Sequence, residues 1–218
     1  MEQEKQFQID LNPLQEQIAQ IEEWLYTESK KKNNNGFYCN WEIIYNSYLN
    51  NKCGILTLNE NVIGFGTWSI YESTSKIEIV EIHPKQRRKG YGNKLINGII
   101  DFLLTENVFV VSADCTNDKS ERLLRKLDFI DFPRNEDKWL RENKQLYKVI
   151  VPSLPTNIDS EGTELIELWD SEPYKCDFIE PKWKWNVKFE NNSTILEKPI
   201  IFPCERDWRV RWKKGNSI

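Results

Sequence analysis

The stretch at residues 82–92, IHPKQRRKGYG, joins a turn-forming proline to a run of cationic and amide side chains that ends in two glycines. The alternation of KIEIVEI at residues 76–82 predicts a strand before it, and the apolar periodicity of NKLINGIIDFLL at residues 93–104 predicts a helix after it. The first amides of a helix point outward unpaired, and the helix dipole adds partial positive charge there. Glycines let a phosphate approach such amides closely. We therefore expect this stretch to bind a phosphate group.

Other uses of the stretch agree less well with the sequence. The nucleotide-binding pattern G-x-x-x-x-G-K-S/T is absent, and a dinucleotide fingerprint would need a third glycine where Leu95 stands. Nucleic acid is disfavoured as a partner because the formal net charge is −4 and only Tyr91 interleaves the cations. An ordinary strand-to-helix turn with solvated cations remains the alternative.

Three motifs between residues 77 and 129 carry a resemblance to a known family. Arg87, Gly90 and Gly92 match the pyrophosphate-loop pattern Q/R-x-x-G-x-G/A of the GNAT superfamily of N-acetyltransferases. Residues 82–84, IHP, are similar to its V-x-P strand end, and residues 117–129, NDKSERLLRKLDF, to its helix motif N-x-x-A-x-x-L-Y-x-x-x-G-F. The chain thus resembles a GNAT N-acetyltransferase over about residues 53–151, most strongly over residues 77–129.

This resemblance implies an α/β fold with a mixed, mostly antiparallel sheet flanked by helices. The order of the expected elements agrees, because the early strands are hairpin-linked and the later ones are separated by helices. The first helix should start at Pro13, with Asn12 as its N-cap, and stop in SKKKNNNG at residues 29–36. Further helices are expected at residues 41–49, from residue 92 onward and at residues 117–127, and strands at residues 53–58, 62–71, 76–82, 108–113 and 146–151.

The sequence changes character after Pro152, where tryptophans and prolines become frequent. We expect a GNAT-like acyl-CoA-binding domain at residues 1–151 and a Trp-rich C-terminal extension at residues 152–218 that packs on it. KWKWNVKF at residues 182–189 and DWRVRWK at residues 207–213 alternate like strands, so the extension should be β-rich. It could close the acceptor side, add strands to the sheet edge, or bind a second copy of the chain or another protein.

Histidine and cysteine usage excludes several function classes. His83, expected as a turn residue before Pro84, is the only histidine, so metal sites and Ser-His or Cys-His nucleophile pairs have almost nothing to use. The five cysteines are odd in number and none lies two residues from another, which argues against a disulfide framework. No apolar run could span a bilayer and no secretory signal is visible, so a cytoplasmic location is the default expectation.

The resemblance implies that acetyl-CoA is the co-substrate and that no metal ion is needed. Its pyrophosphate would lie on the amides of residues 88–93, and its pantetheine arm between the strands at residues 76–82 and 108–113. Backbone groups of the first strand would pair with the arm, and Asn117 would meet it from the other side. The residues expected to bind the cofactor are Val80, Glu81, Ile82, Arg87, Arg88, Lys89, Gly90, Tyr91, Gly92, Asn93 and Asn117.

Acyl transfer to an amine requires the amine to be neutral, and three carboxylates lie near the expected site: Glu81, Glu78 and Asp114. Glu78 and Glu81 have opposite parity on their strand, so at most one of them should face the acceptor. We favour Glu81 as the general base because it is closest to the thioester. Solvent-facing or ion-paired strand residues are the alternative for each of the three.

The helix motif departs from the family pattern at three positions. Leu124 stands where many relatives have a tyrosine that protonates the leaving thiolate, which weakens the expectation of catalysis. A thiol has a pKa of about 8.5, so the thiolate is a tolerable leaving group without an acid. Asp128 replaces a glycine and requires a left-handed conformation that Asp tolerates, and Ser120 for alanine is a minor change.

We expect acetyl transfer from acetyl-CoA to a primary amine of a small molecule or a peptide. A CoA-binding or partner-binding module of the same fold with little turnover is the alternative, favoured by Leu124 and by the extension. No motif identifies the acceptor. Five aromatic residues could form an acceptor wall or simply the core of a short helix: Phe37, Tyr38, Trp41, Tyr45 and Tyr48.

Overall fold

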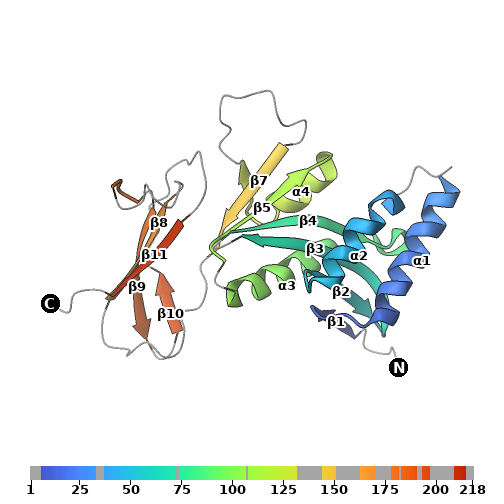
Figure 1. The fold of residues 1–218 in the computed structure, drawn as a ribbon, viewed down its shortest axis with the longest axis horizontal. Coiled ribbons are helices and arrows are strands. Elements are labelled where there is room, and N and C mark those ends of the chain that lie inside the picture. Colours follow the sequence, from blue (N-terminus) through green and yellow to red (C-terminus); the bar gives the residue numbers. More distant parts are fainter. Residues whose placement is uncertain are drawn as a thin grey trace.

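The structure, a computed structural model, describes residues 6–32, 37–71, 74–106, 108–131, 144–150, 163–169, 178–181, 183–190, 193–196 and 209–214. Its strands form two sheets (Figure 1). The first has seven strands in the order β1-β2-β3-β4-β5-β7-β6. These are β1 (Phe7–Asp10), β2 (Cys53–Leu58), β3 (Asn61–Tyr71), β4 (Thr74–Ile82), β5 (Val110–Cys115), β6 (Ile130–Asp131) and β7 (Lys144–Val149). Only β4 and β5 pair in parallel within it, which confirms the mixed, mostly antiparallel sheet.

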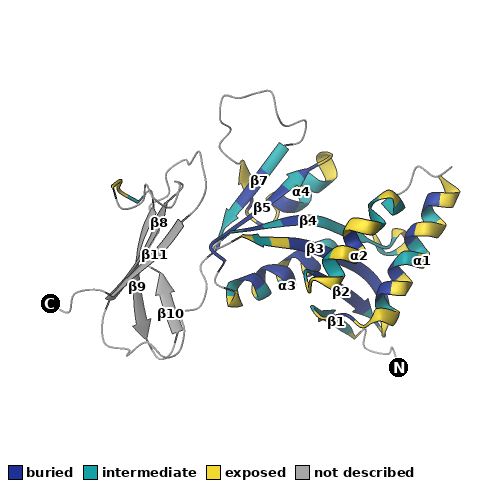
Figure 2. Ribbon diagram, in the orientation of Figure 1, coloured by how far each residue is buried: buried dark blue, intermediate teal, exposed yellow. Residues whose placement is uncertain are grey.

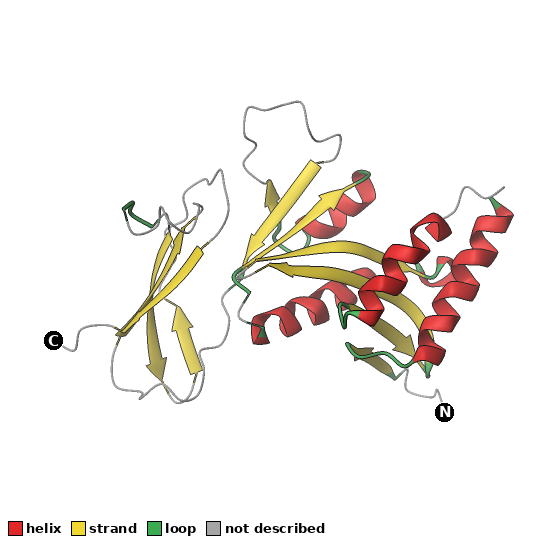
Figure 3. Ribbon diagram, in the orientation of Figure 1, coloured by secondary structure: helices red, strands yellow, loops and turns green. Residues whose placement is uncertain are grey.

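Helices cover both faces of this sheet (Figure 3). They are α1 (Gln15–Lys31), α2 (Trp41–Leu49), α3 (Tyr91–Thr105) and α4 (Asp118–Arg125), with 3-10 turns η1 (Phe37–Asn40) and η2 (Pro84–Gln86). Ile55 of β2 packs in a core with α1 and α2, and its neighbour Leu56 packs in a second core with α3 and α4. Successive strand residues point to opposite faces, so the two helix pairs lie on opposite faces, with the buried residues between the layers (Figure 2).

Two N-terminal features differ from the prediction. α1 begins at Gln15, two residues later than expected, and Leu14 is its N-cap, with its N–H donating to Gln17 Oε1 at 2.7 Å. Asn12 is therefore not the cap; its N–H donates instead to Asp10 Oδ1. Strand β1 was not predicted, because four residues carry too little alternation and their partner, β2, is more than forty residues away, as the pairing of Phe7 with Leu58 shows.

A bulge in β4 changes which side chains share a face of the sheet. Thr67 of β3 pairs with Ile79 and the next residue, Trp68, pairs with Ile77, so Glu78 is an extra residue in the ladder. As a result Ile77 joins the α3–α4 core, whereas Ile79 packs against the α1–α2 core. The expected alternation along the strand is therefore interrupted at one of the candidate bases.

Both glutamates consequently lie on the face that carries α1 and α2. The Glu81 carboxylate shares a guanidinium with Glu28 of α1. Glu78 accepts a hydrogen bond from Ser69 and lies with Asp114 around one ammonium, and the strand neighbours of Ser69 and Asp114 face the opposite core. The premise that opposite parity places Glu78 and Glu81 on different faces is wrong, because it assumed an unbroken strand. Which of them faces the acceptor stays a prediction.

The second sheet is antiparallel, in the order β10-β9-β8-β11. Its strands are β8 (Thr163–Trp169), β9 (Trp183–Glu190), β10 (Ser193–Leu196) and β11 (Arg209–Lys214). Strands β9 and β11 confirm the two segments whose alternation predicted them. The boundary expected at residues 151 and 152 lies outside the described residues, and the packing of the extension on the main domain stays a prediction.

Candidate active site

A gap opens in the sheet where β4 and β5 separate (Figure 3). Their parallel register ends at Ile77 and Ala113, while β4 continues to Ile82 alongside β3. The edge of β4 that faces away from β3 is thus left without a ladder partner from Glu78 onward, within the register that the structure describes. The gap lies where the pantetheine arm was expected.

Main-chain groups of alternate β4 residues face this gap. The N–H of His83 donates to the carbonyl of Ile63 in β3, and successive residues direct their main-chain groups to opposite edges of a strand. The groups of Ile82 and Val80 therefore face the gap, whereas those of Glu81 face β3. Of the three residues expected to pair with the arm, Val80 fits best, since the Ile82 carbonyl already accepts from Arg87 Nε at 2.9 Å.

The loop after β4 has the geometry of an anion site. Arg88 and Gly90 have φ of 66° and 82°, and Gly90 is the N-cap of α3. The first backbone bond that enters the helix comes from Lys94 N to Gly90 O, so the preceding amides point past the helix end. A Cβ on Gly90 would meet nothing within 4 Å, so the space beside Gly90 is open. These are the backbone features that the sequence analysis expected of a phosphate loop.

Gly92 has a different reason to be glycine. A Cβ there would lie 3.2 Å from Leu123 Cδ2, which is tight for a methyl group. Gly92 therefore lets α3 pack closely against α4. We had expected both glycines to serve phosphate approach, and the packing requirement of Gly92 was not visible in the sequence.

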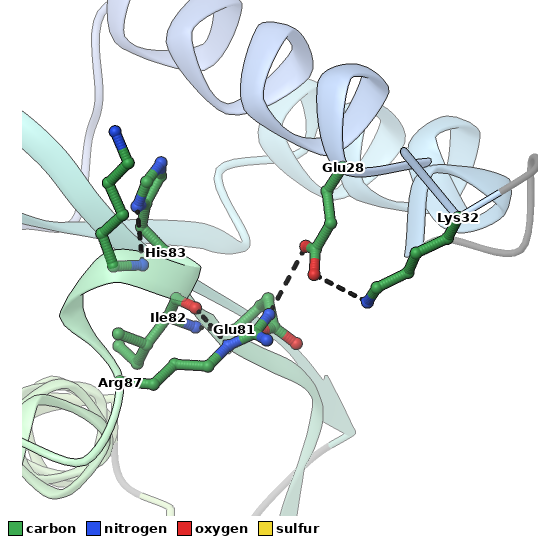
Figure 4. Close-up of polar contacts among 7 residues, drawn as sticks. Glu28, Lys32, Glu81, Ile82, His83 and Arg87 are labelled. Carbon is green, nitrogen blue, oxygen red and sulfur yellow. Dashed lines mark hydrogen bonds and ion pairs between the residues drawn. The ribbon is translucent and has the colours of Figure 1, made fainter. Parts of the chain in front are cut away.

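Glu81 at the end of β4 and Arg87 in the following loop meet a residue that is distant in sequence, Glu28 of α1 (Figure 4). The Arg87 guanidinium donates to Glu81 Oε1 from Nη2 at 2.7 Å and from Nε at 3.2 Å, and its Nη2 lies 3.4 Å from Glu28 Oε2. Glu28 also accepts from Lys32 at 2.7 Å. The side chain of Arg87 therefore contacts carboxylates, whereas the resemblance had placed this residue at the phosphate.

Glu81 is a mostly buried carboxylate at the end of β4. Burial raises the pKa of its carboxyl, and the Arg87 ion pair and the Ile82 N–H offset this only in part. Every hydrogen bond that its carboxylate makes within the described residues goes to Oε1, from Arg87 and from Ile82 N–H at 3.2 Å. Its second oxygen, Oε2, accepts no hydrogen bond within the described residues, and the Glu81 side chain is 21% exposed.

Glu78 and Asp114 have a different environment. They hold Lys76 Nζ between them, at 3.2 Å and 3.1 Å. Burial lowers the pKa of Lys76, but the two carboxylates outweigh it and raise that pKa overall, so the ammonium stays protonated. All three candidate bases are therefore ion-paired. Asp114 Oδ1, like Glu81 Oε2, accepts no hydrogen bond within the described residues, so what distinguishes Glu81 is its lower exposure and its raised pKa.

Two residues of the helix motif have roles within the fold. The Asn117 side chain caps α4, accepting from Lys119 N at 2.9 Å and Ser120 N at 3.1 Å, so its carbonyl oxygen is engaged away from any cofactor arm. Leu124 is 4% exposed and lies in the α3–α4 core, where it can donate no proton. Asp128 has φ of 63°, which confirms the left-handed conformation that its replacement of glycine requires.

An aromatic row runs across α1, η1 and α2. Neighbouring ring centroids lie 5.4 to 6.3 Å apart along the row Tyr26, Tyr38, Trp41, Tyr45 and Tyr48. None of these side chains is buried, whereas Ile44 fills the core side of α2. Four of the five expected aromatic residues form this partly exposed row. Tyr38, Trp41 and Tyr48 also pack partly against the α1–α2 core, as Phe37 does, so both alternatives stay open for them. Tyr26 was missed because it lies on another helix.

Neither Glu28 nor Lys76 was predicted as a site residue, since Glu28 lies in no motif and Lys76 only begins the alternating strand at residues 76–82. Both become visible only when α1 and β5 are placed against β4. Within the described residues, no three metal-ligating side chains gather in one place. Among the described helices, none combines the length and apolarity needed to cross a bilayer.

Comparison with known proteins agrees with this geometry. A family model described as GNAT acetyltransferase matches residues 2–132. The chain belongs to the GNAT acetyltransferase family. No curated protein sequence matches it.

Solved structures of other GNAT proteins share the fold. The PaiA N-acetyltransferase of Thermoplasma acidophilum, in complex with coenzyme A, has a TM-score of 0.52 and 11% identity over 66% of this chain and 99% of its own. An N-acetyltransferase of Staphylococcus aureus has a TM-score of 0.50 and 16% identity over 66% and 98%. N-acetylglutamate synthase of Neisseria gonorrhoeae, complexed with coenzyme A and N-acetyl-glutamate, has a TM-score of 0.51 and 17% identity over 67% of this chain. The match spans only 36% of that synthase, and at these identities the likeness concerns the fold alone.

Proposed function

We propose that this GNAT protein is an N-acetyltransferase that moves an acetyl group from acetyl-CoA to a primary amine of a small molecule or a peptide. The observation that carries the proposal is the pairing of an open, left-handed phosphate loop at Arg88 and Gly90 with a partly free carboxylate, Glu81, at the end of the same strand. The loop supplies amides for the diphosphate. The carboxylate supplies a base beside the gap.

The amides of residues 88–93 would hold the pyrophosphate, with the exposed side chains of Arg88 and Lys89 adding positive charge nearby. The main chain of Val80 would pair with the pantetheine arm in the gap. Gly92 and Asn117 would shape the site indirectly, through the packing of α3 on α4 and the cap of α4.

An amine with a pKa of about 10.4 costs about 4 to 5 kcal/mol to deprotonate at neutral pH, so a base beside the acceptor accelerates transfer. Glu81 Oε2 would take a proton from the ammonium, and the neutral amine would attack the thioester carbonyl. The carbon–sulfur bond then breaks and the CoA thiolate leaves with the electron pair, while the attacking nitrogen, which has one proton too many for an amide, loses it to water or to the departing thiolate. Leu124 supplies no acid for this thiolate, which leaves as the anion or takes a proton from water or from that nitrogen.

A CoA-binding module with little turnover is the second candidate. The buried position of Leu124 favours it, because no hydroxyl replaces the usual tyrosine at that point of the core. Both candidate functions use the loop at residues 88–93 in the same way, to bind the diphosphate of CoA.

Thiol release separates the two candidates. The full chain is incubated with acetyl-CoA and a panel of primary amines, and free thiol is followed with and without each amine. Release that depends on the amine supports the acetyltransferase, and calorimetric binding of CoA without release on any amine supports the module. Absence of CoA binding would refute both.

A further inference from the structure

The Arg87 guanidinium links the end of β4 to helix α1 (Figure 4). Its partners, Glu81 and Glu28, are separated by more than fifty residues, and the structure places both carboxylates on one nitrogen, Nη2. Lys32, one turn along α1, holds the other oxygen of Glu28 at 2.7 Å. The side chain of Glu28 is only 13% exposed, so this carboxylate is fixed in place rather than free in solvent.

Arg87 contacts Glu81 in an uncommon way. Arginine often grips a carboxylate through both oxygens, as Arg125 does with Asp131, whose Oδ1 and Oδ2 both lie 2.9 Å from Nη2. With Glu81, both donors of Arg87 converge on Oε1. Arg87 Nη2 also donates to Glu28, and Arg87 Nε also donates to the Ile82 carbonyl. These two contacts hold the guanidinium in an orientation that leaves Glu81 Oε2 without a hydrogen bond from it.

We propose that Glu28 is a positioning residue for acetyl transfer: by anchoring Arg87 it prevents two-oxygen capture of Glu81 and keeps Oε2 free to accept the proton of the acceptor amine. This inference rests on the proposed function. Glu28 itself touches no reacting atom and acts through Arg87.

The pKa shifts of Glu28 and Glu81 agree with Glu28 as the anchor and Glu81 as the base. Burial raises the pKa of Glu28, but Lys32 and Arg87 together lower it below its ordinary value, so Glu28 is the ionised anchor. Burial raises the pKa of Glu81, and the negative charge of Glu28 adds to that rise. Within the described residues, the charged groups that act on Glu81 are Arg87 from the loop and Glu28 from α1. One guanidinium thus serves two carboxylates whose pKa values are pushed apart, an arrangement typical of acid–base sites.

Glu28→Gln in the full chain tests the proposal, with Glu23→Gln as the matched control because Glu23 is an exposed residue of the same helix. Carbon-13 NMR follows the titration of the Glu81 carboxyl, assigned by Glu81→Gln. Turnover against pH follows thiol release at saturating acetyl-CoA. Glu28→Asp, which keeps the charge, serves as the rescue variant, and thermal melting checks that each variant is folded.

We expect Glu28→Gln to lower the pKa of Glu81, because a like charge is removed and Arg87 can close on both oxygens. The acid limb of kcat should move to lower pH with it, and kcat at neutral pH should fall about tenfold, as for a misplaced base. KM for acetyl-CoA should change less than about twofold, and Glu28→Asp should recover part of kcat. Glu23→Gln should match the wild type in every readout.

An unchanged Glu81 titration in folded Glu28→Gln would overturn the positioning role, whether or not turnover is seen. A wild-type protein that releases no thiol with any amine would instead overturn the proposed function, while the NMR titration would still decide whether Glu28 acts on Glu81. The two failures are therefore distinguishable.

Discussion

The face of the sheet that carries α1 and α2 holds two carboxylate clusters, and they differ in how far their candidate bases are buried: the Glu81 side chain is 21% exposed, and those of Glu78 and Asp114 are 35% and 32% exposed. At the end of β4, Arg87 contacts one oxygen of Glu81, and burial raises the pKa of that group. In the middle of β4, Lys76 is held between Glu78 and Asp114 and stays protonated. Acids on one face of a sheet can thus lie in different electrostatic environments although each is paired with a cation. An ion pair alone does not distinguish them; the burial and the geometry of the cation do.

The largest expected effect separates the two clusters by turnover. Glu81→Gln should lower kcat by about 10²- to 10³-fold, because the base is lost, and leave the CoA dissociation constant nearly unchanged. Glu78→Gln and Asp114→Asn should each stay within about threefold of the wild type, because their carboxylates neutralise Lys76. Amine-dependent thiol release and calorimetry with CoA give the two quantities.

The reverse result, with turnover lost in Asp114→Asn and kept in Glu81→Gln, would assign the base to the lysine cluster. Asp114 Oδ1 is buried without a hydrogen-bond partner among the described residues, so it is the acid to watch in that case.

The second effect tests whether the phosphate loop belongs to the Glu81 cluster. Gly90→Val should weaken CoA binding at least about tenfold, because a β-branched residue is strained at φ of 82° and its side chain would occupy the open space at the amides. Calorimetric titration with CoA measures the change, and far-UV circular dichroism checks the fold. Wild-type affinity in this variant would place the cofactor elsewhere and remove the reason to prefer Glu81.

The third effect is a pH dependence that only the Glu81 cluster should show. A base works when ionised, so kcat should fall as the pH drops through the raised pKa of Glu81, above the range of an ordinary glutamate. Arg87→Met removes a charge that favours the ionised form, so the acid limb should move to higher pH, by about one unit. The same measurement on Lys76→Met should show no displacement. An acid limb of kcat that is displaced in Lys76→Met and unchanged in Arg87→Met would contradict the assignment of Glu81 as the base.

Most helices and strands of the first sheet could be predicted from local patterns in the sequence. Strand β2 and helix α2 agree with their predicted bounds, because uninterrupted apolar periodicity and polar flanks mark both ends. The motif around Gly90 located the loop for the same reason, since its constraint is backbone geometry within a few residues.

The site could not be completed from sequence because its remaining features depend on contacts between distant elements. The sequence KIEIVEI alternates without interruption, so it does not reveal the bulge at Glu78. The bulge is visible only in the pairing of β4 with β3. Glu28 meets Arg87 across more than fifty residues, and no periodicity encodes that contact. Gly92 was correctly placed in the loop, but its packing against Leu123 needs the position of α4.

The smallest expected effect is on stability, and it tests whether the carboxylates around Lys76 are less buried than Glu81. Lys76→Met should lower the free energy of unfolding by about 1 kcal/mol or less, because all three side chains of this cluster are about one third exposed and solvent screens the pairs. Lys119→Met is the control, since Lys119 is exposed and makes no ion pair within the described residues. Urea unfolding at neutral pH measures both. A loss of several kcal/mol, absent in Lys119→Met, would mean that Glu78 and Asp114 are desolvated far more than their exposure indicates, and the lysine cluster would then satisfy the same burial criterion that selects Glu81.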